Sequence, residues 1–172
     1  MIGLARADIS LEVTNATFLR LSFAASRYFL DGLGEQRPTP RFNMHDMTPD
    51  HALAHLSRDL AIALEFSDQG LCRLRIGGQH IVDLEVDDSR ESIFIYCRMG
   101  TLPGGDVGAG LLVRLMRAHC LGRETARVQF GLDQDDVMAF SRVELRGAAD
   151  DALRVALEAL IELTDQWSRE LI

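Results

Sequence analysis

The chain contains no lysine, and all 18 of its basic residues are arginine. This bias points to the codon usage of a GC-rich genome before it points to chemistry. The chain also carries 26 Asp and Glu residues, so the formal net charge is −8 and the sequence pI is about 5.0. A protein of this charge is repelled by phosphate backbones and by anionic membrane surfaces. We therefore expect no nucleic-acid partner.

Cysteine is scarce, and the three residues Cys72, Cys97 and Cys120 are too far apart to form the close pairs of metal or redox sites. We expect buried thiols in a reducing compartment. The first 11 residues lack the basic start and apolar run of a secretory signal, and no segment is long and apolar enough to span a membrane. These features predict a cytoplasmic protein without membrane insertion.

The length of 172 residues and the hydrophobic content of 47% fit one globular domain plus an extension. Residues 1–47 are the expected N-terminal extension. It contains a predicted helix over residues 14–30, with Phe18, Leu21 and Phe29 at helical spacing, and a Gly/Pro linker over residues 31–40. Residues 48–172 are the expected domain.

The domain reads as a helix, three strands, a helix, two strands and a closing helix. Thr48 is the predicted N-cap of the first helix, and Gly77-Gly78 predicts a hairpin between the first two strands. Asp106 is the predicted cap of the second helix. The expected segments are 49–64, 72–76, 82–86, 92–99, 106–121, 128–132, 137–145 and 149–171. The fold class is α+β, with an antiparallel five-stranded sheet and helices in α-β-β-β-α-β-β-α order.

Catalytic and metal-binding patterns are weak. His51, His55 and Asp59 share one helix face, but they lack the His-Glu-x-x-His order of hydrolytic zinc sites, so a solvated face is favoured. His119 and Cys120 are adjacent on a helix and point about 100° apart. The glycines of residues 100–108 lack the Gly-Lys-Ser/Thr ending of a phosphate loop. We predict no catalytic residue, no metal and no cofactor.

The alternating acids Asp83, Glu85 and Asp87 resemble no calcium loop, and we interpret them as a solvated strand face.

Two strands are apolar on both faces, which predicts an apolar patch on the outer side of the sheet. Its expected members are Ile81, Phe94, Tyr96, Met138 and Phe140. Extended peptides bind such sheets through side-chain pockets and edge pairing. The predicted helix over residues 14–30 can also cover this patch within the same chain. The sequence does not decide between these two interpretations.

The order of segments resembles that of the class I type III secretion chaperones, the Tir-chaperone (CesT) family. The resemblance extends over residues 50–171 and includes the short sequence segments LAIAL (60–64), GTLP (100–103) and LLVRLM (111–116). One departure is Glu65-Phe66, where the family often has Gly-Leu after the first helix. Residues 1–47 are a second departure, since they are additional to the family pattern.

The resemblance implies a cytoplasmic bacterial homodimer that holds the N-terminal segment of one or several secreted effectors ready for export without using ATP. It implies a role in virulence and names the export ATPase as a candidate further partner. By position, the outer patch resembles the effector-binding surface. The helix over residues 106–121 resembles the dimer helix, with Leu111, Leu112, Leu115, Met116 and His119 at the interface. The alternative is a regulatory adaptor of the same fold that binds a folded secretion-system protein.

Overall fold

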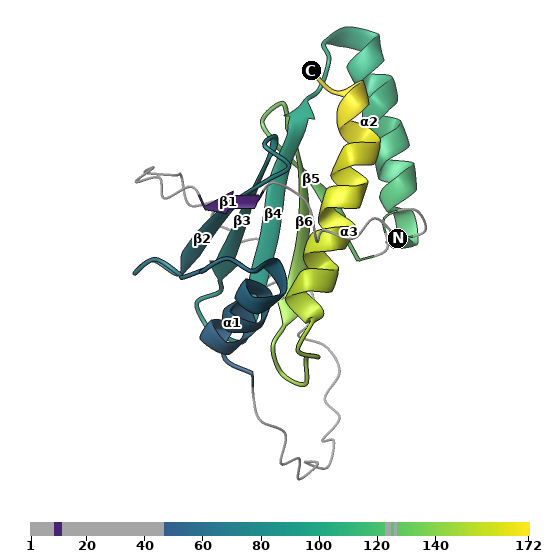
Figure 1. Ribbon diagram of the computed structural model, residues 1–172. Helices are drawn as coiled ribbons and strands as arrows, with labels where there is room; N and C mark the ends of the chain where they lie inside the picture. The colour runs from purple at the N-terminus through teal and green to yellow at the C-terminus, as the bar shows by residue number, and fades with distance from the viewer. Residues whose placement is uncertain (1–8, 12–46, 123–124, 126) are drawn as a thin grey trace, which may run out of the picture.

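The structure is a computed structural model that describes residues 9–11, 47–122, 125 and 127–172 (Figure 1). The predicted helix over residues 14–30 and the linker over residues 31–40 lie outside the described residues. The elements in chain order are β1 (Ile9–Leu11), α1 (Pro49–Leu60), β2 (Leu71–Ile76), β3 (His80–Val86), β4 (Ser92–Thr101), α2 (Gly105–His119), η3 (Cys120–Gly122), β5 (Gln129–Asp133), β6 (Asp136–Glu144), α3 (Ala152–Trp167) and η4 (Ser168–Glu170).

The strands form one antiparallel sheet in the order β1-β2-β3-β4-β6-β5. Strands β2 to β6 confirm the predicted five-stranded sheet, and β1 adds a sixth strand at the β2 edge. Helices α1 and α3 contact each other, and α3 packs on β4 and β6 (Figure 1). Helix α2 contacts β5 at the other edge. None of the helices in the described part of the chain is long and apolar enough to cross a membrane.

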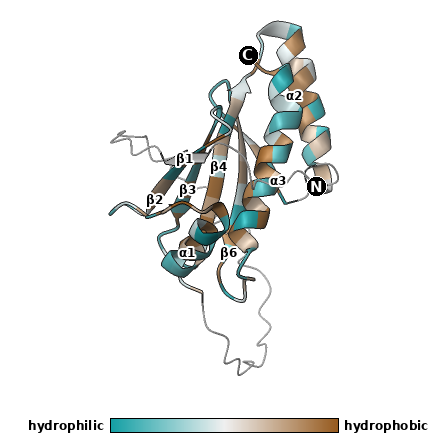
Figure 2. Cartoon of the chain, viewed as in Figure 1, coloured by the Kyte–Doolittle hydropathy of each residue, from teal (hydrophilic) through white to brown (hydrophobic). Residues whose placement is uncertain are grey.

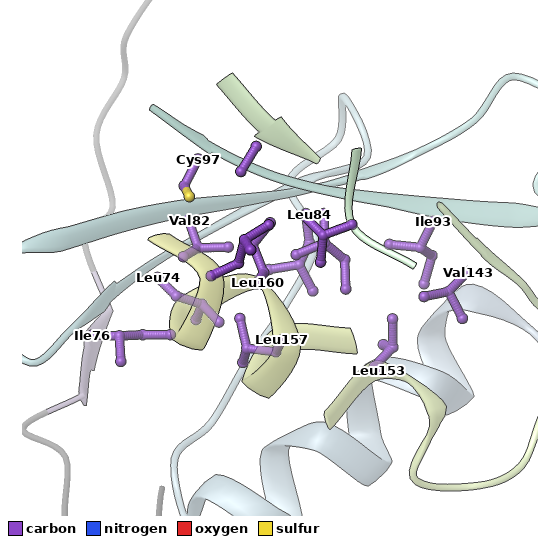
Figure 3. Close-up of a cluster of buried hydrophobic side chains, with 14 of the residues drawn as sticks. Leu74, Ile76, Val82, Leu84, Ile93, Cys97, Val143, Leu153, Leu157 and Leu160 are labelled. Carbon is purple, nitrogen blue, oxygen red and sulfur yellow. The ribbon is translucent and has the colours of Figure 1, made fainter. Parts of the chain in front are cut away.

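The core lies between the sheet and α3. Leucines of α3 at three- and four-residue spacing point toward the strands, as Figure 3 shows for Leu153, Leu157 and Leu160. The facing strand residues are fully buried and include Leu74, Val82, Leu84, Ile93 and Ile95. Burying a side chain of this size stabilises the fold by roughly 2 kcal/mol relative to leaving it exposed. We call this side of the sheet the helix-covered face.

The helix boundaries differ from the prediction where the backbone ends a helix locally. Thr48 is confirmed as the N-cap of α1, because its side chain accepts a hydrogen bond from the His51 N–H at 3.2 Å. The helix ends at Leu60 rather than near residue 64, since Ala61 adopts a left-handed conformation with φ of 56°. The N-cap of α2 is Gly104, and Asp106 lies in the first turn, where an acid interacts favourably with the helix dipole.

The glycines of residues 100–108 allow close packing around the start of α2. A Cβ on Gly108 would lie 1.8 Å from the carbonyl oxygen of Pro103, and one on Gly100 would lie 2.6 Å from Cβ of Leu171. Next to Gly100, Thr101 and Ile172 exchange two backbone hydrogen bonds of 2.9 and 3.0 Å. This segment therefore joins β4, α2 and the final residues of the chain.

The approach of Gly108 to Pro103 predicts a large penalty for any side chain at position 108. Gly108→Ala should lower the free energy of unfolding by about 2–3 kcal/mol, because the new methyl group overlaps the carbonyl. Gly110→Ala is the matched control in the same helix, where an added Cβ has no neighbour within 4 Å. It should leave stability equal or raise it by about 0.5–1 kcal/mol. Urea unfolding followed by circular dichroism tests both, and equal stability of the two variants would contradict this packing.

Candidate functional site

The five residues of the predicted patch lie together on the face of the sheet opposite α1 and α3, which we call the outer face. Side chains alternate between the two faces of a strand, so burial of Ile93 and Ile95 against the helices places Phe94 and Tyr96 on the outer face. Tyr96 is directly opposite Phe140 in the β4–β6 pair. Ile81, two residues before Asp83 on β3, is directly opposite Arg75 of β2, and Met138 is opposite Arg98. All five patch residues are partly exposed.

A half-buried ion pair lies beside the patch. Nε of Arg73 donates to Oδ1 of Asp83 at 2.6 Å, and Nη2 donates to Oδ2 at 2.7 Å. The two side chains are only 13% and 11% exposed. The expectation that the acids of β3 form a solvated face is therefore wrong for Asp83, which sits directly opposite Arg73 in the register. A carboxylate this buried is stable only with a well-oriented cationic partner.

Tyr96 contributes a neutral hydroxyl to the same face. Its hydroxyl donates to Oε2 of Glu85 at 3.2 Å. Burial, followed by the negative charges of Asp83 and Glu85, raises the pKa of Tyr96 well above its usual value. The phenol therefore stays protonated across the physiological range and acts as a donor with an apolar ring.

Arg142 covers part of Phe94, with its guanidinium carbon 5.5 Å from the ring centroid. This distance is typical of a cation–π contact. Arg142 is positioned by Nε–H···Oγ of Ser92 at 2.9 Å and by Oδ2 of Asp87 at 3.3 Å. Asp87 also accepts from the hydroxyls of Ser92 and Ser89 at 2.7 and 3.0 Å. The β3–β4 turn thus fixes the cation that lies over the patch.

The outer face combines hydrogen-bonded polar groups with partly exposed apolar side chains. Asp83, Glu85 and Asp87 each have a hydrogen-bonding partner, so the accessible feature is apolar surface between satisfied polar groups. Across the described residues, no cluster of three His, Cys, Asp or Glu side chains is arranged to hold a metal ion. The candidate triad on α1 is engaged elsewhere: Nδ1 of His55 lies 2.7 Å from Nη2 of Arg58, and Asp59 lies 3.5 Å from Arg154.

The thiols differ in accessibility. Burial raises the pKa of Cys72 to about 11 and that of Cys97 to about 11, so both remain protonated near neutral pH. Sγ of Cys97 also lies 3.2 Å from Oγ1 of Thr164. Cys120 is exposed at the end of α2. The expectation of buried thiols is therefore correct for two of the three cysteines.

Helix α2 presents a second apolar surface, which includes two of the five residues predicted for the dimer interface. Leu111 and Leu115 are buried in the core of this chain, and His119 is partly buried with its ring 6.2 Å from Phe130. Leu112 is partly buried and Met116 is 59% exposed. Val107 and Val113, which are not among the predicted interface residues, are 71% and 50% exposed. Successive residues of an α-helix are about 100° apart, so Leu112, Val113 and Met116 share one side of α2 and Val107 lies on another side. We call Leu112, Val113 and Met116 the α2 face; hydrophobic bands run along this helix in Figure 2.

A clamp fixes α2 against the end of α3. Arg114 forms a two-point ion pair with Glu170, in which Nη2 lies 2.9 Å from Oε1. The same guanidinium lies 5.5 Å from the ring centroid of Trp167, whose ring contacts Phe130 edge-on. These contacts of Arg114 fix the rotation of α2 about its own axis. The α2 face, on the other side of the helix, therefore has a fixed orientation.

The environment of Asp87 predicts a pH-dependent contribution to stability. Burial alone would raise its pKa, but the hydrogen bonds from Ser92 and Ser89 and from the Ser92 and Glu91 N–H groups outweigh it and lower the pKa. A lowered carboxyl pKa stabilises the fold above the unfolded value of about 3.9, and this stabilisation is lost as the pH falls further.

Asp87→Asn should therefore lower the free energy of unfolding by about 1–2 kcal/mol at pH 7. The difference from the unchanged protein should shrink below about pH 4. Urea unfolding at several pH values measures it, with the exposed neighbour Asp88→Asn as the control. A deficit that is independent of pH would show that the Asp87 charge is not the cause.

Solved structures of secretion chaperones share this fold. The Yersinia pestis type III secretion chaperone SycH, in complex with a stable fragment of YscM2, matches with a TM-score of 0.59 at 17% identity, over 70% of this chain and 99% of that chain. The HopA1–SchA chaperone–effector complex matches with a TM-score of 0.56 at 21% identity, over 72% and 91%. The heterodimeric ExoU–SpcU complex of the Pseudomonas aeruginosa type III secretion system matches with a TM-score of 0.58 at 17% identity, over 69% and 95%.

At these identities the structures establish the fold. No curated protein sequence matches the chain closely enough to indicate a relationship. The family assignment comes from the sequence itself, because the Tir chaperone protein (CesT) family pattern matches residues 51–168, well over half of the chain. The resemblance predicted from the segment order is thereby confirmed, and the chain belongs to the Tir chaperone protein (CesT) family.

Proposed function

We propose that this protein is a type III secretion chaperone that binds the N-terminal segments of effector proteins and keeps them export-competent in the bacterial cytoplasm. The observation that carries the proposal is the outer face: five partly exposed apolar residues gather there on β3, β4 and β6 of a chain from the CesT family. The structures of a HopA1–SchA chaperone–effector complex and of an ExoU–SpcU complex support it, since both share this fold.

The chemistry of the outer face suits an extended segment. An unfolded client loses conformational entropy on ordering, and it recovers this loss by burying apolar side chains over a wide surface. The ion pair of Arg73 and Asp83 gives the face little unpaired charge, so apolar contact dominates. Such binding prevents aggregation of the client and needs no catalytic group. The role we propose is therefore binding and not catalysis.

The α2 face supports the proposal of a homodimer. Leu112, Val113 and Met116 are partly or largely exposed apolar residues on one side of α2, and a two-fold axis would bring this side of the helix against its own copy. Dimerisation would present two outer faces to one client or to two. We further propose that residues 48–172 form the chaperone domain, that residues 1–47 are an extension of it, and that the export ATPase receives the loaded complex.

Charge on the outer face should abolish client binding. Phe94→Asp and Phe140→Asp should each remove effectors from the captured material, because a carboxylate placed in the apolar patch is costly to bury. The tagged protein is captured from its own bacterium under secretion-inducing conditions, and partners are identified by mass spectrometry. Val155→Asp, on exposed α3 surface, is the control and should retain every client. Circular dichroism verifies that each variant is folded.

Retention of the same effectors by Phe94→Asp and Phe140→Asp would contradict the role of the outer face. Capture of folded cytoplasmic proteins alone, by the unchanged protein, would instead indicate a regulatory adaptor.

Charge on the α2 face should produce a monomer. Val113→Asp combined with Met116→Asp places two carboxylates at the proposed two-fold contact, where like charges from both copies meet. Light scattering after size exclusion should give half the mass of the unchanged protein, and Val155→Asp should keep the full mass. A mass that does not change would exclude α2 as the dimer helix.

A further inference from the structure

Two charged side chains of α2 lack a partner within the chain. Arg114 is paired with Glu170 at the end of α3. Asp106 in the first turn and Arg117 in the last turn are exposed, and no group among the described residues forms a hydrogen bond or an ion pair with either side chain. Figure 1 shows α2 at the right-hand edge of the molecule, beside α3. Both charges are therefore accessible to a second molecule.

The two charges share one side of α2 with Val113 of the α2 face. Asp106 and Arg117 are about three helical turns apart, so their side chains lie within about 20° of each other around the helix axis. Gly110 and Val113 lie between them, within about 40° of both. Gly110 is exposed, and a Cβ added there would have no neighbour within 4 Å. We call these four residues the α2 stripe: Asp106, Gly110, Val113 and Arg117.

The α2 stripe is complementary to a second copy of itself. In a two-fold contact, a residue that touches a second residue across the interface is touched by it in the same way on the other side. If two α2 helices run antiparallel and cross midway between Gly110 and Val113, Val113 of each copy lies opposite Gly110 of the other. Asp106 of each copy then lies opposite Arg117 of the other. A parallel pair would instead place each charge opposite its own kind.

The distances along the helix favour a shallow crossing. With a rise of 1.5 Å per residue, Asp106 and Arg117 each lie about 8 Å from the crossing point. At a crossing angle of about 20°, the opposed positions are about 3 Å apart sideways, and at about 50° they are about 7 Å apart. Only the shallow angle keeps the guanidinium within reach of the carboxylate. The missing side chain of Gly110 leaves room for Val113 of the other copy at the crossing.

We propose that Asp106 and Arg117 form a reciprocal pair between two copies of this chain, which orients the α2 helices antiparallel and selects a second copy as the partner. The inference rests on the proposed homodimer and adds its orientation and the residues that choose the partner. Two ion pairs form in each dimer because the contact is two-fold. They contribute mainly specificity, since like charges at the same positions of a different partner would repel.

Reversing each charge tests the pair. Arg117→Asp alone and Asp106→Arg alone each create two like-charge contacts per dimer and should raise the dissociation constant of the dimer roughly 10-fold or more. The double variant Asp106→Arg with Arg117→Asp restores unlike charges and should return to within about 3-fold of the unchanged protein. Glu162→Arg, on exposed α3 surface, is the control and should not change dimerisation. Analytical ultracentrifugation over a dilution series measures all four.

The double variant also excludes a simpler role for the two charges. An acid in the first turn and a base in the last turn stabilise a helix through its dipole. If that were their only role, the double variant would be the weakest dimer of the series, because both of its charges oppose the dipole. A double variant that dimerises less well than either single variant would therefore contradict the reciprocal pair.

Mixing the two single variants tests the choice of partner. Arg117→Asp carries an acid at both positions, and Asp106→Arg carries a base at both, so every charged contact between the two chains joins unlike charges. Native mass spectrometry, with a tag on one chain, should show more heterodimer than the half that random pairing gives.

The outcomes separate this inference from the function on which it rests. A heterodimer share of one half, or single variants that dimerise as the unchanged protein does, would refute the reciprocal pair and leave a dimer through the α2 face standing. A monomeric unchanged protein would refute the homodimer and this inference together. Capture of effectors from the bacterium tests the chaperone function independently of both.

Discussion

The packing of α3 on the sheet is the constraint on which the other surfaces depend. Once Leu153, Leu157 and Leu160 cover one face, the alternation of each strand assigns every second residue to the opposite face. Phe94 and Tyr96 are therefore on the outer face because Ile93 and Ile95 are buried under the helices. A shift of one residue in β4 would exchange these two sets, so the apolar core fixes the register of the outer patch.

The polar groups of the outer face take their positions from the same register. Arg73 and Asp83 are opposite each other because the β2–β3 hairpin pairs Ile76 with His80, and the ladder repeats this spacing along both strands. Their ion pair contributes little net stability, since desolvation offsets most of the attraction, but it is costly to break once it is buried. It therefore selects one register of β2 and β3 while leaving the neighbouring surface apolar.

The sequence predicts those helices and strands whose apolar residues recur at a regular spacing. Alternation in β2 and β3 and helical spacing in α3 predicted an antiparallel sheet and the order of the elements along the chain, and Thr48 was recognised as a cap from its chemistry. The sequence does not show which part of α2 meets the core, because Leu111, Leu112 and Leu115 span a wide arc, and the structure buries Leu111 and Leu115 within the chain. The burial of Asp83 could have been predicted from the sequence. If the Gly77-Gly78 hairpin pairs Ile76 with His80, the antiparallel register places Asp83 opposite Arg73. Strand β1 could not have been predicted, because three residues are too few for a period.

The order of the strands places the α2 face and the β2 edge at opposite ends of the sheet. Helix α2 contacts β5 at one edge of the sheet, whereas β1 covers β2 at the other edge, with β3, β4 and β6 between them. A dimer formed through the α2 face would therefore leave both β2 edges at its outer ends, each beside its own outer face.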